Sequence, residues 1–212
     1  FNKMKNIVSK IHINRIEYQF FLLIFLCFIS FIFINILGIK EISQLAYYSG
    51  YLIKEPHRIL LYNFVHKDLN HLFSNIFGII IIRYCFINLK IKSTNLFCYL
   101  TTLIIILQTF MLYLIDNFLL NKYDHFLIGF SGIVFGVNAY LMMASYFGTN
   151  QFFMKFIGLK RNYYIFRLNL FILSFGFMYS LIPGISLKGH LCGSLSGLII
   201  FYLSKTIFRN EY

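Results

Sequence analysis

The stretch "KGHLCGSLSGLII", residues 188–200, decides how this chain folds. Gly189, Gly193 and Gly197 recur every four residues in an apolar run, which makes two consecutive GxxxG steps. In a membrane helix such steps form a face on which a neighbouring helix packs closely. His190 begins the same run, where a lone histidine is more often a hydrogen-bonded structural residue than a catalyst. Its role therefore depends on the helix that packs against it.

A second stretch, "FLIGFSGIVFGV" at residues 126–137, offers a matching face. Gly132 and Gly136 form another small-residue step, and helix packing explains them well. Packing does not explain Ser131, the only hydroxyl of this run. The stretch is not the GxSxG turn of the α/β hydrolases, because isoleucine stands where the second glycine belongs. Close contact of the two helices would bring Ser131 within hydrogen-bond reach of His190, the arrangement in which histidine accepts a serine proton.

A third stretch, "HKDLNHLFSN" at residues 66–75, opens a further apolar run. His71 and Asn75 lie four residues apart, which on a helix puts them on one face, about 6 Å apart along the axis. Both side chains can then donate hydrogen bonds toward one point in a helical bundle, as an oxyanion requires. The alternative is that they cap this helix and link it to its neighbours, as imidazoles and amides often do in membranes.

The composition is that of a membrane protein. Apolar residues make up 59% of the 212 residues and charged residues only 12%, well below the share in soluble domains. We therefore expect an all-α membrane protein with a single domain over residues 1–212, in which residues 1–17 form a cytosolic N-terminal segment. This composition argues against a soluble protein of two domains. Six spans are expected, at about residues 18–38, 70–89, 96–116, 128–147, 165–182 and 190–206.

The net charge of +12 is explained by membrane topology, without nucleic-acid binding. With both termini in the cytosol, 13 of the 19 Lys and Arg residues fall on the cytosolic side of the six spans, in agreement with the positive-inside rule. The four cysteines are scattered singly through apolar runs, without the spacing of a metal site, so we expect them to pack and expect no metal. The long connection at residues 39–69 mixes aromatic and charged residues, which indicates a functional or membrane-associated loop.

In this order and spacing, the three motifs resemble those of the rhomboid family of intramembrane serine proteases, over essentially the whole chain. That family has HxxxN at the start of the second span, GxSG at the start of the fourth, and a histidine followed by GxxxG in the sixth. Here the motifs read "HLFSN", "GFSG" and "GHLCGSLSG". The resemblance implies a rhomboid-like bundle of six transmembrane helices with a long membrane-associated first loop. It also implies a serine endopeptidase that cleaves transmembrane segments of membrane proteins and needs no cofactor.

The resemblance also implies roles for individual residues. Ser131 is the expected nucleophile and His190 the general base and then acid of a catalytic dyad. His71, Asn75 and the Ser131 backbone amide are expected to bind the oxyanion. The supporting residues are Gly129 and Gly132 around the serine, Arg58 and His66 in the first loop, and Phe135, which is expected to stack on the catalytic histidine. Residues 182–190 are expected to form the loop that caps the site.

Two of the departures from the family pattern are at positions where the family usually has Trp or Tyr. His57 stands where the family usually has Trp, so the anchoring of the first loop differs. Phe135 stands where a Tyr is common; stacking on the histidine survives this change, but a hydroxyl contact does not. Neither departure removes a catalytic group.

The expected location is the plasma membrane (cell inner membrane) of a bacterium, as an integral multi-pass protein with both termini in the cytosol. Polar side chains at membrane depth are tolerated where they face a wet cavity. We therefore expect the four site residues to line a pocket open to the extracytosolic side. The expected partners are transmembrane protein substrates and the lipid bilayer.

Two other functions fit some of these residues. A non-catalytic rhomboid-like protein that binds membrane clients usually lacks the serine or the histidine, and this chain keeps both. A small transporter predicts paired charges at the membrane midplane or broken helices, whereas the acidic residues here cluster in expected loops. Asp124 and His125 are expected to be a solvated loop pair. No aspartate is placed to orient His190, so a dyad is favoured over a triad.

Overall fold

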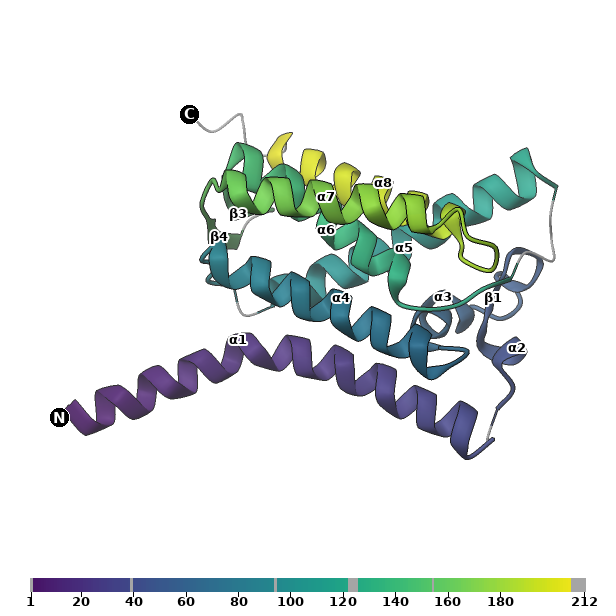
Figure 1. Ribbon diagram of the computed structural model, residues 1–212, viewed down its shortest axis with the longest axis horizontal. Helices are drawn as coiled ribbons and strands as arrows, with labels where there is room; N and C mark the ends of the chain where they lie inside the picture. The colour runs from purple at the N-terminus through teal and green to yellow at the C-terminus, as the bar shows by residue number, and fades with distance from the viewer. Residues whose placement is uncertain (1, 39, 94, 122–125, 154, 207–212) are drawn as a thin grey trace.

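The computed structural model describes residues 2–38, 40–93, 95–121, 126–153 and 155–206. Six long helices run back and forth along one direction, so that the start of the first and the end of the last lie at the same end of the bundle (Figure 1). They are α1 (Asn2–Phe31) with the π-helical turn η1 (Ile32–Ile36), α4 (Leu69–Asn88), α5 (Leu96–Leu114) with the π-helical turn η4 (Ile115–Leu119), α6 (Ser131–Phe147), α7 (Tyr163–Tyr179) and α8 (Leu187–Thr206).

Each expected span coincides with one of these helices, although several boundaries differ. The fourth helix begins at Ser131 rather than at residue 128, and the sixth begins at Leu187 rather than at residue 190. The expected N-terminal segment is helical from Asn2 and continuous with the first span. Within the described residues, three stretches are both long and apolar enough to cross a membrane. They are Glu17–Ile36, Leu69–Asn88 and Leu96–Leu119, while α6 and α7 are apolar but shorter.

The chain is mostly helical, as expected of the all-α class, and it also forms two small antiparallel sheets. One pairs β1 (Tyr47–Tyr48) with β2 (Phe126–Leu127), and the other pairs β3 (Thr149–Phe152) with β4 (Lys155–Leu159). In the first sheet Tyr47 lies opposite Leu127, so the long first loop is joined to the residues before α6. The helix α6 starts at Ser131 rather than at residue 128 because the chain turns at Gly129, whose φ of +105° is not helical.

The first loop folds at one end of the bundle. Besides β1 it contains the short helices α2 (Ile42–Leu45), η2 (Ser49–Tyr51), α3 (Arg58–Leu61) and η3 (Tyr62–Phe64). In Figure 1, β1, α2 and α3 lie together at the end where α4, α6 and α8 begin, and β3 and β4 lie at the opposite end. Because alternate helices of such a bundle start on the same side, the residues at the starts of α4, α6 and α8 gather beside the first loop.

Glycines allow α6 and α8 to pack backbone against backbone. A Cβ atom added to Gly193 would lie 2.0 Å from the carbonyl oxygen of Gly132. One added to Gly197 would lie 1.9 Å from the carbonyl oxygen of Gly136. The two glycine faces expected from the sequence therefore meet, step for step, as small-residue faces do in membrane helix pairs.

Because the contact at Gly197 is with rigid backbone, a side chain there must push the helices apart. We expect Gly197→Ala to destabilise the protein by about 1–3 kcal/mol, the usual range for overpacking, and to lower its unfolding temperature in detergent. The matched control is Gly189→Ala on the same helix, where the new methyl group meets the movable side chain of Leu127 at 3.0 Å. Equal unfolding temperatures for the two variants would contradict this account of the helix contact.

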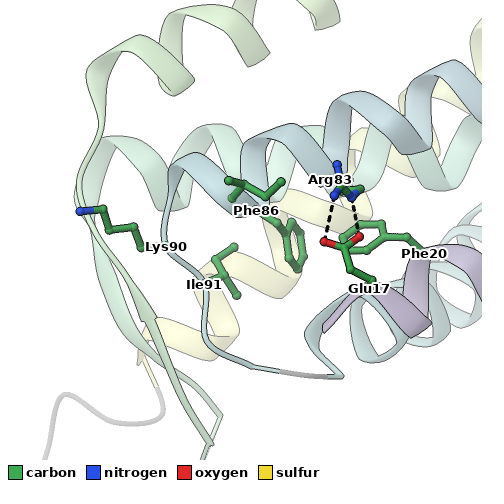
Figure 2. Close-up of a pocket in the computed structure, with 7 residues that line it drawn as sticks. Glu17, Phe20, Arg83, Phe86, Lys90 and Ile91 are labelled. Carbon is green, nitrogen blue, oxygen red and sulfur yellow. Dashed lines mark hydrogen bonds and ion pairs between the residues drawn. The ribbon is translucent and has the colours of Figure 1, made fainter. Parts of the chain in front are cut away.

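At the other end of the bundle, an ion pair links α1 to α4. The guanidinium group of Arg83 donates to both carboxylate oxygens of Glu17, at 2.5 and 3.0 Å. The pair borders a pocket that is also lined by Phe20, Phe86, Ile87, Lys90 and Ile91 (Figure 2). Glu17 is only partly exposed, so the pairing satisfies its charge where α1 packs on α4. This link was not predicted from the sequence, because the two partners are 66 residues apart.

Candidate active site

Ser131 is the first residue of α6 and is half-buried. The chain reaches it through Gly129, whose backbone φ of +105° lies in a region that residues with a side chain rarely adopt. The amide of Gly129 donates to the carbonyl of Tyr62 at 2.9 Å, which holds this turn against the first loop. The Ser131 hydroxyl therefore stands at a helix N-terminus, where backbone amides lack helical partners.

His190 lies in the first turn of α8 and is buried. Its Nε2 atom is 2.9 Å from the Oγ atom of Ser131, a hydrogen-bond distance. The two residues are 59 positions apart in the chain, and the glycine contacts between α6 and α8 allow their helices to come this close. The juxtaposition expected from the glycine patterns is thus present.

Phe135, one helical turn after Ser131, supports the histidine ring from one face. The rings of Phe135 and His190 are parallel within 3°, and their centroids are 4.1 Å apart. Stacked ring pairs of this kind contribute more stabilising free energy than the burial of their surface area alone. Phe135 thus limits the directions in which the imidazole can rotate.

His71 and Asn75 lie on the first two turns of α4, which starts after the N-cap residue Asp68. The Asp68 carboxylate accepts a hydrogen bond from the backbone amide of His71 at 2.7 Å. A Cβ atom added to Gly129 would lie 2.5 Å from His71 Nε2 and 3.6 Å from Asn75 Nδ2. Both side chains therefore lie against the turn that precedes Ser131, and only a glycine fits between that turn and the imidazole.

Two polar atoms of this group are buried and unpaired. Among the described residues, Asn75 Nδ2 and His71 Nδ1 have no hydrogen-bond partner. Leaving a buried donor unpaired costs about 1–3 kcal/mol, so such groups in a folded protein call for an explanation. A nucleophile bound to an imidazole, with the unpaired amide nitrogen of Asn75 at the preceding turn, is an arrangement that can support attack on a carbonyl carbon.

Gly132 has a different environment from the one that the resemblance implies. Its added Cβ atom would meet the Gln108 side chain at 2.5 Å on one side, while its carbonyl contacts Gly193 on another. The Nε2 atom of Gln108 donates to the hydroxyl of Tyr62 at 3.0 Å. Gly132 thus lies where three helices meet, and it is Gly129 that shapes the turn beside His71.

Arg58 and His66, the two supporting residues of the first loop, have different contacts. Arg58 is buried and donates to the carbonyls of Ser43 and Ala46, both at 2.7 Å, and pairs with Glu55 at 2.6 Å. It therefore holds the first loop together from within. His57, at the position where the family usually has Trp, is exposed.

His66 supports the oxyanion candidate His71. Its Nδ1 atom donates to the carbonyl of Phe64 at 3.0 Å, and its ring meets that of His71 edge to face at 5.0 Å between centroids. Burial, with a smaller contribution from the neighbouring His71, lowers the pKa of His66 to about 4. The ring is therefore neutral near pH 7 and can pack on His71 without charge repulsion.

One buried ion pair contradicts the expectation that the acidic residues cluster in loops. Asp116 is fully buried in the π-helical turn η4, where its carboxylate accepts hydrogen bonds from Lys188 and, at 2.9 Å, from the Tyr47 hydroxyl. Through Tyr47 and Lys188, Asp116 joins the end of the third long helix to the first loop and to the start of α8. Lys188 is two residues before His190. Asp116 was expected in a loop because it lies at the end of an expected span. At such a boundary the sequence does not show whether a side chain points into the helical bundle.

Ser180 is a further residue of the site that was not predicted from the sequence. It follows the last residue of α7, and its Oγ atom lies 2.6 Å from the Nδ1 atom of His190. Gly176 and Ser180 form a small-residue step of four in the sequence, the same signal that marked α6 and α8. Applied to the fifth span, that signal would have indicated a close helix contact here, but not that Ser180 contacts His190.

Three further expectations concern two loops and the four cysteines. The expected capping loop at residues 182–190 is shorter, because α8 begins at Leu187. Asp124 and His125 lie outside the described residues. Of the four cysteines, Cys27, Cys85 and Cys192 are buried, as expected of packing residues, and Cys98 is partly buried.

Comparison with known proteins places these residues in a family. The model of the rhomboid domain matches residues 54–206, which span the later part of the first loop and helices α4 to α8. The expected site residues, from Arg58 to His190, all fall within this match. A comparison with curated proteins gives no match. The matched region covers most of the chain and its helices are strongly apolar, so the protein is an integral membrane protein that belongs to the rhomboid family.

Proposed function

We propose that this protein is an intramembrane serine endopeptidase that cleaves transmembrane segments of other membrane proteins. The observation that carries the proposal is the 2.9 Å hydrogen bond between Ser131 Oγ and His190 Nε2. Membership of the rhomboid family supports it, since that family is generally one of serine intramembrane proteases. The unpaired Asn75 Nδ2 atom, which lies against the turn that precedes Ser131, gives further support.

In the proposed reaction, the Ser131 oxygen attacks the scissile carbonyl carbon while His190 Nε2 takes the hydroxyl proton. The resulting oxyanion accepts hydrogen bonds from Asn75, His71 and the Ser131 backbone amide. When the carbon–nitrogen bond breaks, His190 gives its proton to the leaving amine. Water then attacks the acyl-enzyme, with His190 again as base, and releases the new carboxylate and the free serine.

The proposed topology has six spans in one domain over residues 1–212, with both termini in the cytosol. The starts of α4, α6 and α8 then face the extracytosolic side, where water can enter a polar pocket. The buried pair of Asp116 and Lys188 at this end fits that orientation, because paired charges at a helix end need not cross the hydrocarbon core. We place the protein in a bacterial plasma membrane, with transmembrane proteins as substrates and no cofactor, metal or nucleic acid.

The family also contains members that bind membrane clients without cleaving them. Such a role would leave the Ser131–His190 hydrogen bond without a task, which weighs against it. A small transporter is a weaker candidate, since the one fully buried carboxylate named here, Asp116, is neutralised by Lys188 and lies at a helix end.

The proposal can be tested on the full chain in liposomes. The first step is labelling with a fluorophosphonate, followed by mass spectrometry to locate the modified residue. The second is incubation with a panel of single-span proteins that carry small residues near the outer end of the span. We expect the label on Ser131 and cleavage of at least one panel member inside its span. Binding of panel members without cleavage, together with an unlabelled Ser131, would instead favour the client-binding role.

A further inference from the structure

The end of α7 touches the candidate catalytic histidine, although no motif assigned a function to this helix. Ser180 is 3% exposed. Its Oγ atom lies 2.6 Å from His190 Nδ1 and also 2.6 Å from the carbonyl oxygen of Gly176. Both distances are those of short hydrogen bonds to a hydroxyl. Both ring nitrogens of His190 therefore face serine hydroxyls, Ser131 at Nε2 and Ser180 at Nδ1.

The position of the protons follows from the partners. A carbonyl oxygen can only accept, so the contact with Gly176 uses the single hydroxyl proton of Ser180. The Ser180 oxygen must then accept a proton from Nδ1 of His190. If the hydroxyl pointed at Nδ1 instead, two oxygen atoms would face each other at 2.6 Å with no proton between them. A neutral imidazole carries one N–H, so Nε2 has its lone pair free and directed at Ser131.

The same turn of α7 also supports the face of the histidine ring. A Cβ atom added to Gly176 would lie 2.4 Å from the tip of the Phe135 ring. Phe177 packs on Phe135 with ring centroids 5.2 Å apart. Phe135 in turn stacks on the face of His190. Helix α7 therefore restrains the imidazole in two ways, directly at its edge through Ser180 and indirectly at its face through Phe135.

We propose that Ser180 is a positioning residue that completes a Ser131–His190–Ser180 triad. It holds the imidazole in the tautomer that can accept the Ser131 proton, the task that an aspartate performs in many serine proteases. After proton transfer, the Ser180 oxygen still accepts from Nδ1, while its own proton remains bound to Gly176, and such chains of hydrogen bonds polarise one another. This inference rests on the proposed protease function, and it adds a positioning residue to the expected Ser131–His190 dyad.

The test compares Ser180→Ala and Ser180→Thr with wild type in the liposome cleavage assay. We expect Ser180→Ala to lower kcat about 10-fold, the effect of one hydrogen bond of ordinary net strength, with little change in KM. Ser180→Thr keeps the hydroxyl and should retain most of the rate. The matched control is Ser145→Ala, because Ser145 is likewise buried near the end of a helix, where its hydroxyl donates to the carbonyl of Met142 at 2.9 Å. A wild-type kcat in Ser180→Ala, or an equal loss in Ser180→Thr, would overturn the role of Ser180.

A second measurement decides the matter even if a variant folds poorly or the protein cleaves nothing. In ¹⁵N-histidine-labelled wild type, the resonances of His190 are identified by their loss in His190→Gln. We expect protonated Nδ1 and unprotonated Nε2 in the neutral ring, and a shift toward a tautomer mixture in Ser180→Ala. Protonated Nε2 in wild type would refute the proposal. Absence of cleavage with the expected tautomer would instead refute only the protease function.

Discussion

We expect His190→Ala to lower kcat/KM for cleavage of a transmembrane substrate by about 10⁴-fold or more. His190 Nε2 lies 2.9 Å from Ser131 Oγ, and without the imidazole no other described group is in place to accept the serine proton. A serine that keeps its hydroxyl proton is a weak nucleophile. Losses of this size are typical when one member of a Ser-His pair is removed. The measurement is the initial rate of product formation in liposomes, with protein amounts matched.

The His190 result is informative only beside its controls. Ser131→Ala should show a similar loss, and the double variant should be no worse than either single variant, because residues that act as a unit are not additive. His57→Ala removes an exposed histidine of the first loop and should keep the wild-type rate. A rate in His190→Ala within tenfold of wild type would mean that another group acts as the base.

The second large effect is expected at Asn75. Removing one donor from an oxyanion site costs about 100- to 1,000-fold in kcat, and we expect Asn75→Ala to fall in this range. The variant should nevertheless unfold at the same or a higher temperature. In the free protein the Nδ2 atom of Asn75 is buried without a partner among the described residues, so the substitution removes an unpaired donor.

A lower kcat together with an equal or higher unfolding temperature would distinguish an oxyanion-binding role of Asn75 from a role in linking neighbouring helices. If Asn75 served to bind a neighbouring helix, its loss would lower the unfolding temperature along with the rate. The matched control is Asn88→Ala at the other end of the same helix, where the exposed amide donates only to the carbonyl of Tyr84 at 2.8 Å in the described structure. A stable protein with an undiminished rate in Asn75→Ala would remove Asn75 from the proposed site.

The helices of this protein could be predicted because their signal is local. Long apolar runs and the four-residue spacing of glycines depend on neighbouring residues alone. This is why the α6–α8 contact, and with it the meeting of Ser131 and His190, could be expected from the amino-acid sequence. The ends of the helices were less predictable. Phe126 and Leu127 are as apolar as a helix interior, yet they pair with Tyr47 and Tyr48 of the first loop.

Polar partners far apart in the chain were beyond the reach of sequence reasoning. Arg83 binds Glu17 across 66 positions, and Lys188 binds Asp116 across 72. Neither pair follows a helical spacing, so no periodic signal connects the partners. Their pairing depends on how α1 packs on α4 and on how the first loop closes over the ends of α5 and α8.

The sequence by itself determined the membrane class, the six helical segments and the residues that meet at the starts of α4, α6 and α8. It could do so because hydrophobic length and small-residue spacing specify which helices form and which faces touch. Only the tertiary structure decided that the second nitrogen of His190 faces Ser180 and that Gly129 leaves room for His71. Those contacts are set by the rotation of α7 and by a backbone turn with positive φ. Both of these result from the packing of the whole bundle, and neither is encoded in a local pattern.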